Sequence, residues 1–336
     1  MGREIVFTGK REFRLLDYDE APLGAGEVRG PTLATLVSPG TELAWADGDS
    51  FPLRPGYAAV FEAEEIGPAV AGIERGDRLL CMGAHRSTQQ FDARYILKLP
   101  RGMAAETGVI ARLMGVSMTT LMTTAARPGD RVIVCGAGPV GYLAAHQCRI
   151  AGYDVTLVEP DEERRTHARD SGIERTLAAV PVEDPAYQGK VTLVIDCSGH
   201  EKAVLDGCRV VRRRGEVVLV GVPWKAHTGL LAHEILNAVF FNHAVLRSGW
   251  EWEVPILSRG FVWEELYEGY NNAPHSTFSG LATALRWLDE DRVPLKGLIR
   301  TMSPEDPGQL YGGLIAREVR EPFVVLDWRN SRAAQA

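Results

Sequence analysis

The segment VIVCGAGPVG, residues 132–141, constrains the possible folds more than any other part of the chain. Its apolar start predicts a β-strand, and Gly136, Gly138 and Gly141 have the spacing G-x-G-x-x-G. A helix is expected to begin at these glycines, and a second predicted strand ends at Glu159, eighteen residues after the last of them. A strand, a glycine-rich turn, a helix and a second strand in this order are typical of a unit that binds a dinucleotide.

Each residue of the turn has a physical reason to be there. Gly136 permits the tight turn, Gly138 lets a pyrophosphate approach the backbone, and Gly141 lets the helix pack closely on the strand. Pro139 and Val140 complete the turn, where the N–H groups of the helix start are expected to bind the phosphates.

Two residues bear on which dinucleotide binds. The Glu159 carboxylate would accept hydrogen bonds from a ribose 2′-hydroxyl and repel a 2′-phosphate, which favours NAD. Arg164 could bind a 2′-phosphate instead, although its surroundings, DEERR, also fit a solvated helix face. The sequence favours NAD and leaves NADP open.

The remainder of the chain shows two different patterns of predicted secondary structure. Residues 1 to about 100 contain short strands separated by Gly and Pro turns, which predicts a small β-barrel. Residues 104–126 have helical spacing, and beyond them strands alternate with helices, which predicts a doubly wound parallel sheet covered on both faces. We therefore expect an α/β protein with domains at 1–120 and 121–250, completed by a return segment at 251–336.

Composition excludes several classes of function. The net charge of −7 disfavours nucleic acid or an anionic membrane as a partner. The charged N-terminus does not resemble a signal peptide, and no apolar stretch is long enough to span a bilayer. The five cysteines are scattered without a C-x-x-C pair, which favours reduced thiols in the cytoplasm and argues against a structural zinc.

With these motifs together, the chain resembles the medium-chain dehydrogenase/reductase superfamily over nearly its whole length. The resemblance rests on GAGPVG with Glu159, VSPGTEL, PGYAAVFEAEEIG followed by GDRLL, and the closing FVVLDW. It implies a GroES-like β-barrel catalytic domain and a Rossmann domain. It also implies an NAD(P)-dependent enzyme that acts on a small molecule, usually as a homodimer or homotetramer.

The resemblance departs from the zinc-dependent members at their metal ligands. Their Cys-Gly-Ser/Thr-Asp motif reads PGTE at residues 39–42, and their Gly-His-Glu motif reads GYA at 56–58. The run that would supply the third ligand, LMGVSM, offers only Met114 or Gly115, and the structural-zinc lobe is reduced to one Cys in 81–100. Because Pro and Ala cannot bind zinc and Tyr is a poor ligand, we predict no metal. The chain most resembles a zinc-independent branch of bacteriochlorophyllide dehydrogenase-like and sugar or cyclitol oxidoreductases.

The resemblance also suggests catalytic candidates, each with a structural alternative. Thr41 matches the hydroxyl that starts the proton relay in zinc-dependent relatives, but could simply cap a turn. Tyr57 occupies a ligand position and could donate a phenolic hydrogen bond, or could pack in the vacated pocket. His85 follows a barrel strand that borders the substrate cleft in the family, and imidazole suits proton exchange near neutral pH, although a single His is often structural.

The resemblance places other residues near the cofactor and substrate. Ser198, Gly221 and Val222 end sheet strands and would border the nicotinamide and its ribose. Trp224 would flank the substrate, and Trp250 opens an aromatic segment that could cover the cleft or form a dimer contact. Further polar candidates could favour a hydroxyl-rich ligand: Arg86, Gln89 and Gln90.

The favoured function is hydride transfer between NAD(P) and a polar secondary alcohol or ketone, such as a sugar, cyclitol or natural-product intermediate. One alternative is an NAD(P)H-dependent reductase of an activated C=C bond, for which a Tyr would be the natural proton donor. A second alternative is a nucleotide-binding redox sensor without turnover.

Overall fold

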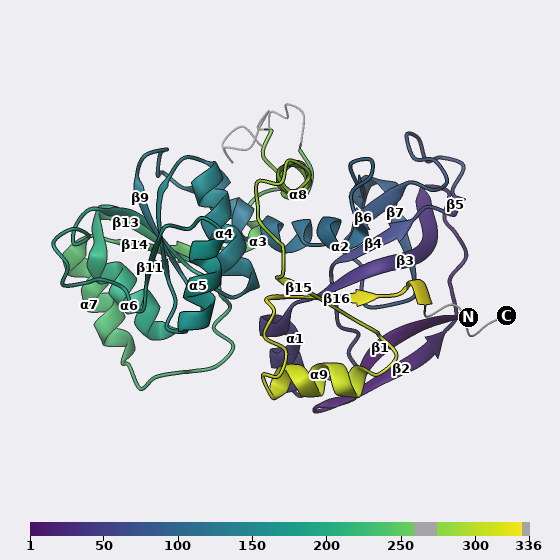
Figure 1. The fold of residues 1–336 in the computed structure, drawn as a ribbon, viewed down its shortest axis with the longest axis horizontal. Coiled ribbons are helices and arrows are strands. Elements are labelled where there is room, and N and C mark those ends of the chain that lie inside the picture. The colour runs from purple at the N-terminus through teal and green to yellow at the C-terminus, as the bar shows by residue number, and fades with distance from the viewer. Residues whose placement is uncertain (259–273, 331–336) are drawn as a thin grey trace. The chain divides into compact units, whose positions relative to one another are not determined.

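The computed structural model describes residues 1–258 and 274–330, and the chain forms two compact units (Figure 1). Unit 1 comprises Met1–Arg112, Leu285–Glu290 and Leu295–Ala336, and unit 2 comprises Leu113–Ala284 and Asp291–Pro294. The main change of unit therefore falls at 112/113, where the sequence suggested about 120. The segment up to Ala284 stays with unit 2, where the sequence suggested a return at 251.

Unit 2 is built on a six-stranded parallel sheet. Its strand order is β11-β10-β9-β12-β13-β14, which is the doubly wound order expected for a dinucleotide-binding domain. The strands are β9 (Arg131–Cys135), β10 (Asp154–Val158), β11 (Arg175–Leu177), β12 (Val191–Asp196), β13 (Val211–Leu219) and β14 (Val245–Ser248). The order reverses between β9 and β12, and ligands of such sheets bind where the carboxyl ends of the strands meet at this reversal.

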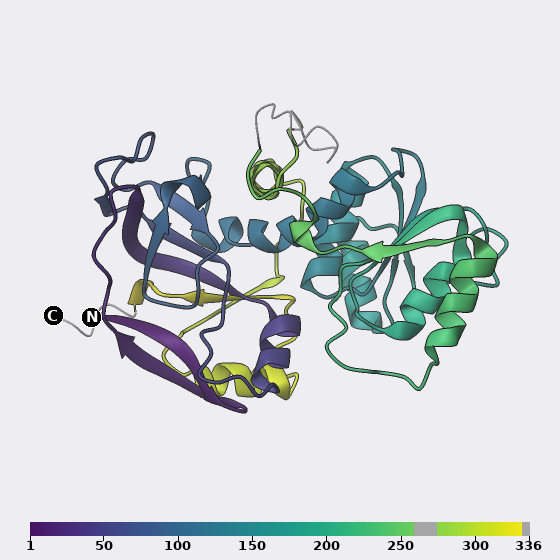
Figure 2. The ribbon, with the colours of Figure 1, turned by 180° about the vertical axis from the view of Figure 1, so that it is seen from behind.

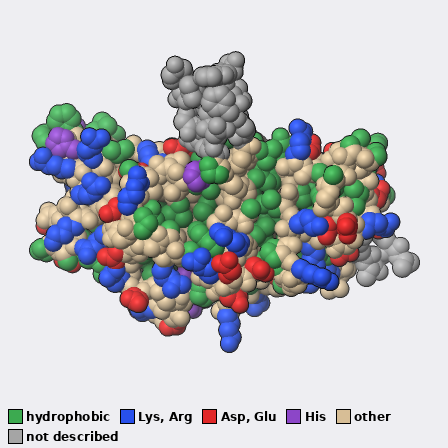
Figure 3. All heavy atoms as spheres, turned by 90° about the horizontal axis from the view of Figure 1, so that it is seen from above, with side chains coloured by type: hydrophobic (Ala, Val, Ile, Leu, Met, Phe, Trp, Pro, Cys, Tyr) green, Lys and Arg blue, Asp and Glu red, His purple; other side chains and the backbone are tan. Residues whose placement is uncertain are grey.

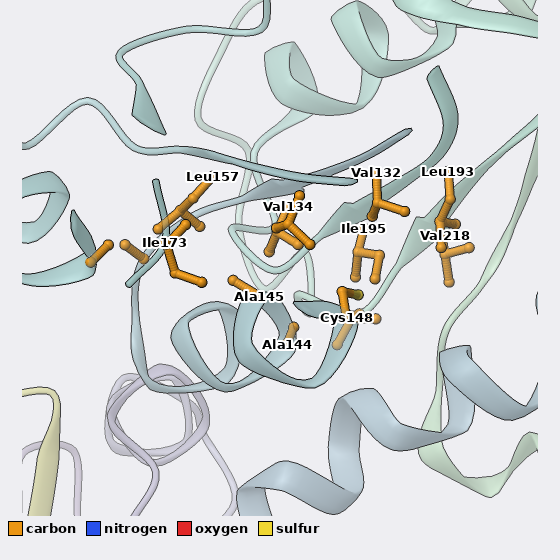
Figure 4. Packing of buried hydrophobic residues seen from close by; sticks show 14 of the residues in the cluster. Val132, Val134, Ala144, Ala145, Cys148, Leu157, Ile173, Leu193, Ile195 and Val218 are labelled. Carbon is orange, nitrogen blue, oxygen red and sulfur yellow. The ribbon is translucent and has the colours of Figure 1, made fainter. Parts of the chain in front are cut away.

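Helices cover both faces of this sheet, as the alternating pattern predicted. They are α3 (Ala111–Thr123), α4 (Pro139–Ile150), α5 (Glu162–Asp170), α6 (Glu201–Val210) and α7 (Ala232–Asn242). On one face, Ala144 and Cys148 of α4 pack on Val134 and Ile195 of the sheet (Figure 4). The small side chains of α4 let the helix approach the strands closely, which holds the glycine turn at its start in a fixed position.

The start of β13 shows how burial sets the boundary of an element. The arginines at 212–214 could continue the helix before them, but α6 ends at Val210. Val211 is buried and pairs with Val191 of β12, so the chain joins the sheet immediately. The burial of this valine outweighs the helical preference of the arginines that follow it.

Unit 1 contains the β-rich domain that the N-terminal pattern predicted. One sheet has the order β15-β16-β3-β4-β6-β8, with β5 and β7 also pairing with β3. Its strands are β3 (Glu27–Val37), β4 (Ala59–Glu62), β5 (Glu65–Ile66), β6 (Arg78–Cys81), β7 (Thr88–Asp92), β8 (Leu97–Lys98), β15 (Ile299–Met302) and β16 (Phe323–Asp327). The predicted closing strand FVVLDW is therefore present as β16, and it pairs antiparallel with β3.

A separate hairpin and three α-helices complete the described part of this unit. They are β1 (Gly2–Gly9), β2 (Glu12–Tyr18), α1 (Pro39–Ala46), α2 (Ala105–Gly108) and α9 (Pro307–Ile315). A further helix, α8 (Thr277–Asp289), belongs to unit 2 up to Ala284 and to unit 1 beyond it. Figure 2 shows the β1–β2 hairpin beside α9, with α1 next to that helix. Phe7 of the hairpin packs edge-on against Tyr311 of α9, with ring centroids 4.9 Å apart. This packing brings the C-terminal part of the chain against α1.

The outer surface carries charges of both signs. On the face drawn in Figure 3, Lys and Arg side chains are interspersed with Asp, Glu and apolar side chains. Within 1–258 and 274–330, no helix combines the length and apolar character needed to cross a membrane. Of the predicted aromatic segment, Trp250 and Trp252 are described, whereas Trp263 lies outside the described residues.

Candidate active site

The glycine turn between β9 and α4 has the geometry that dinucleotide binding requires. Gly136 has φ +92°, which a side chain would strain, and a Cβ on Gly141 would come within 1.8 Å of the Gly136 carbonyl oxygen. A Cβ on Gly138, by contrast, would meet nothing within 4 Å. The backbone is thus open at the residue where a pyrophosphate must approach. Pro139 occupies the first turn of α4, where its missing N–H costs nothing.

Glu159 is held against this turn. One oxygen of its carboxylate accepts the N–H of Ala137 at 2.7 Å, and the other accepts the N–H of Asp161 at 3.0 Å. Arg164, on the exposed side of α5, has its guanidinium 3.9 Å from the carboxylate. Glu159, which the sequence linked to the choice between NAD and NADP, is therefore bonded to the glycine turn, and Arg164 of α5 lies near its carboxylate.

The predicted residues after β12 and β13 pack against the same turn. A Cβ on Gly136 would lie 3.2 Å from Cβ of Ser198, and one on Gly221 would lie 2.8 Å from the Ser198 nitrogen. The Ser198 hydroxyl donates to the buried Asp196 carboxylate at 2.6 Å, so it fixes its own turn. Burial raises the pKa of Asp196, while the hydrogen bonds from this turn oppose the shift.

Three predicted residues of unit 2 are exposed. Val222 is 49% exposed, Trp224 is 48% exposed and Trp250 is 66% exposed. Large apolar side chains left in solvent often mark a surface that contacts a ligand or a second protein. Their exposure agrees with a binding role, but no contact in the structure assigns one.

In unit 1, a cluster of hydroxyl groups surrounds Tyr57. The Tyr57 hydroxyl donates to Oγ of Ser38 at 2.6 Å. Burial raises the pKa of Tyr57 above its ordinary value, while hydrogen bonds with the Ser38 and Thr41 side chains oppose the rise. Thr41 lies in the first turn of α1, which begins at Pro39, so it belongs to a helix rather than to the suggested turn.

Glu42 links this cluster to a second, fully buried one. Its Oε1 accepts the N–H of Ser38 at 2.8 Å, and its Oε2 accepts the Tyr311 hydroxyl at 2.6 Å. Nε2 of His85 lies 3.1 Å from the same Oε2. Burial and the nearby carboxylate raise the pKa of Tyr311 well above its ordinary value, which keeps it a hydrogen-bond donor.

His85 lies inside this second cluster, not at a surface. It is 0% exposed, and its Nδ1 lies 2.8 Å from the Thr35 hydroxyl. That hydroxyl oxygen accepts the indole N–H of Trp328, so its own hydrogen can go to Nδ1 while Nε2–H donates to Glu42. Both ring nitrogens are engaged by the protein, so the predicted proton exchange between His85 and substrate would have to pass through its neighbours.

The other polar candidates of unit 1 are bonded elsewhere. Gln89 is fully buried and donates to the Ala84 carbonyl and the Thr32 hydroxyl. Gln90 donates to Glu27 and to a backbone carbonyl, and the Arg86 guanidinium lies over the Tyr18 ring. The structure does not gather these three side chains around Tyr57.

Two neighbours of Tyr57 were not anticipated from the sequence. In the sequence, Ser38 is one residue of the motif VSPGTEL, and Arg112 lies within the helical pattern of residues 104–126. Arg112 is 2% exposed, and its guanidinium carbon lies 4.9 Å from the centroid of the Tyr57 ring. An arginine in the apolar stretch GVIARLMG was the available signal, since a buried guanidinium requires a partner.

Comparison with known proteins finds similarity to dehydrogenases. Residues 139–250 match the family described as zinc-binding dehydrogenase. An alcohol dehydrogenase of Geobacillus stearothermophilus is 26% identical over 282 residues, which cover 71% of this chain and 83% of the relative. The L-threonine 3-dehydrogenase of Pyrococcus furiosus is 26% identical over 272 residues, 68% of this chain and 76% of the relative.

Solved structures agree with the fold. The galactitol-1-phosphate dehydrogenase of Escherichia coli superimposes with a TM-score of 0.77 at 17% identity, covering 97% of this chain and 99% of that one. The family match, the two relatives and the superposition together support the medium-chain dehydrogenase/reductase superfamily. The predicted GroES-like domain and Rossmann sheet are confirmed.

The same matches bear on the general activity. They support an NAD(P)-dependent dehydrogenase, so the alternative of a sensor without turnover is set aside. The family match lies within unit 2, which carries the dinucleotide turn, whereas the positions compared with metal ligands at 39–42 and 56–58 lie in unit 1. The question of a metal therefore depends on the side chains of unit 1.

Proposed function

We propose that this dehydrogenase transfers a hydride between NAD(P) and a polar secondary alcohol or ketone without zinc. The substrate class would be a sugar, a cyclitol or an intermediate of natural-product biosynthesis. The observation that carries the proposal is the bond between the Tyr57 and Ser38 hydroxyls, with the Ser38 N–H held by Glu42. The resemblance compares Tyr57 with one metal ligand, and Ser38 precedes Pro39, which it compares with another. This cluster offers a proton donor and acceptor where a Lewis acid would otherwise act.

The side chains at these positions do not fit a zinc ion. Zinc in proteins is bound by Cys, His, Asp or Glu, but Pro39 has no donor atom on its side chain. The Tyr57 hydroxyl is already bonded to Ser38, and Met114, near the third ligand position, is fully buried. Glu42 and His85 are bonded to one another and to their own neighbours. The donor set therefore supports a mechanism without metal.

The proposed reaction assigns cofactor binding to residues of unit 2 and proton transfer to residues of unit 1. Bound NAD(P) supplies or accepts the hydride. The glycine turn binds its pyrophosphate through backbone N–H groups, and Glu159 binds the adenosine ribose. When a ketone is reduced, Tyr57 donates its phenolic proton to the carbonyl oxygen, and Ser38 or Thr41 relays a proton to it by giving up its own hydrogen and taking one from water. When an alcohol is oxidised, the proton moves the opposite way.

Reduction of an activated C=C bond remains the second candidate. The same phenol could protonate the enolate carbon formed by hydride addition, so Tyr57 supports both reactions. The hydroxyls of Ser38 and Thr41 beside Tyr57 favour the alcohol, because they can relay a proton to and from an oxygen.

A substrate panel separates these candidates. Nicotinamide absorbance would be followed with polyols, sugars and cyclitols plus oxidised cofactor, and with enones and unsaturated aldehydes plus reduced cofactor. We expect turnover of polyols or their ketones. Turnover with enones alone would reject the proposal and make the protein a double-bond reductase.

We further propose NAD as the preferred cofactor, because the Glu159 carboxylate lies beside the turn and would repel a 2′-phosphate. Glu159→Gln removes this charge and is expected to change the ratio of the two Kd values by about tenfold in favour of NADP, the size of one hydrogen bond to a charged group. Binding would be measured by calorimetry on the protein without substrate. Glu174→Gln, at an exposed residue of the same unit, should leave the ratio unchanged. An unaltered ratio in Glu159→Gln would remove this residue from cofactor selection.

We also propose a homodimer or homotetramer. Leu236, Phe240 and Phe241 of α7 are 65%, 74% and 67% exposed, and Val245 of the sheet-end strand β14 is 42% exposed. Such an apolar surface beside an open sheet edge favours association. Light scattering after size exclusion should give a multiple of the chain mass, reduced to a monomer by Phe240→Glu with Phe241→Glu. A monomer for the unaltered protein would contradict the proposal.

We propose the cytoplasm as the compartment, because of the state of the cysteines. All five cysteines are free and four of them are buried. Thiols kept in this state fit a reducing environment.

A further inference from the structure

The surroundings of Tyr57 contain a feature that its proposed role does not by itself explain, which is a buried positive charge against its ring. The Arg112 guanidinium lies 4.9 Å from the ring centroid and is almost completely buried. Trp45 also contacts this ring in a T-shaped arrangement, with the two centroids 6.2 Å apart. The ring thus contacts both a cation and a second aromatic ring, while its hydroxyl bonds to Ser38.

Ser38 shows a second unusual feature. It is the N-cap residue of α1, a position where a Ser hydroxyl normally accepts an N–H of the first helical turn. Here the side chain makes no capping hydrogen bond, and its oxygen accepts the Tyr57 hydroxyl instead. Its backbone N–H is fixed by Glu42. The hydroxyl is therefore directed to the phenol and held there by the buried cluster.

We propose that Arg112 and Ser38 are positioning residues that set the orientation and the proton affinity of Tyr57. The inference rests on the proposed role of Tyr57 in proton transfer. A guanidinium stays charged in the protein interior and is attracted to the electron-rich face of an aromatic ring. That attraction is stronger for the phenolate, which carries a full negative charge, than for the neutral phenol.

The balance of charges around Tyr57 agrees with this role. Burial and the Glu42 carboxylate raise the pKa of Tyr57, whereas Ser38, Thr41 and Arg112 lower it. Without the cation, the phenolate would be disfavoured further, and alcohol oxidation would require a higher pH. Arg112 thus supplies a positive charge beside the proton-transfer group in a site whose side chains do not suit a metal.

A titration of Tyr57 tests this inference without any substrate. Difluorotyrosine would be incorporated at position 57, because fluorination lowers the phenol pKa into a range where the fold is stable, and ¹⁹F NMR would follow its ionisation. Arg112→Met should raise the midpoint by about one pH unit or more, the usual effect of losing a unit charge at this distance. Arg112→Lys, which keeps the charge, should raise it less.

Ser38→Ala provides a second test that changes little volume. It removes the hydrogen bond to the phenolate and should also raise the midpoint, with Thr124→Ala of unit 2 as the control that leaves it unchanged. An unchanged midpoint in Arg112→Met, or in Ser38→Ala should the first variant not fold, would overturn the inference. Because the titration uses protein without substrate, it can fail while Tyr57→Phe still abolishes turnover, and it can succeed even if the proposed substrate class is wrong.

Discussion

Replacing Tyr57 by Phe is expected to lower kcat by about 10²- to 10⁴-fold, the usual contribution of a positioned general acid or base. The change removes only the hydroxyl that bonds to Ser38. The ring would keep its packing against Arg112 and Trp45. Steady-state kinetics on the alcohol or ketone identified by the panel would measure the loss, and NAD(P) affinity should be unchanged because the dinucleotide turn lies in the other unit.

A matched control separates proton transfer from general damage. Tyr18→Phe makes the same change in unit 1, where the hydroxyl donates to the Thr88 carbonyl at 3.0 Å. It should leave kcat within about twofold, since that bond serves the hairpin and not the cluster around Tyr57. Full activity in Tyr57→Phe would show that the phenol does not carry the proton, and would direct attention to Thr41.

Replacing Glu42 by Leu is expected to cause the largest loss of stability. The substitution leaves three buried donors without their acceptor: the Ser38 N–H, the Tyr311 hydroxyl and Nε2–H of His85. Each unsatisfied buried group costs about 1–3 kcal/mol, so the free energy of unfolding should fall by about 3 kcal/mol or more. Denaturant unfolding, followed by the fluorescence of Trp328 and the other tryptophans, would measure it.

Glu42→Gln serves as the conservative comparison. The amide keeps one acceptor oxygen in nearly the same volume, so it should lose clearly less stability than Glu42→Leu. Equal stability of Glu42→Leu and the unaltered protein would contradict the view that Glu42 joins the two clusters.

The dinucleotide site could be predicted because its signals are local. Gly136 and Gly141 each have a backbone or packing requirement that only glycine meets, Gly138 leaves open the space where a pyrophosphate is expected, and the flanking strand and helix adjoin them. The acid at the end of the next strand followed from a fixed distance along the chain. Local backbone rules therefore sufficed to place Glu159 beside the turn.

The cluster in unit 1 could not be derived in the same way. The Tyr311 hydroxyl reaches Glu42 across 269 positions of sequence, and the Trp328 indole reaches Thr35 across 293. No short-range pattern encodes such pairings, because they depend on how β16 and α9 pack against the N-terminal strands. For the same reason His85, which looked suited to proton exchange in the sequence, is enclosed by partners that only the fold brings to it.

The metal dependence of turnover tests the central claim most directly. The protein would be treated with chelator, its residual metal measured by mass spectrometry, and its activity on the identified alcohol compared before and after addition of zinc. We predict the same kcat for the metal-free and the zinc-supplemented protein. Loss of activity on removal of metal, with recovery in proportion to bound zinc, would contradict the account and restore a Lewis acid to the mechanism.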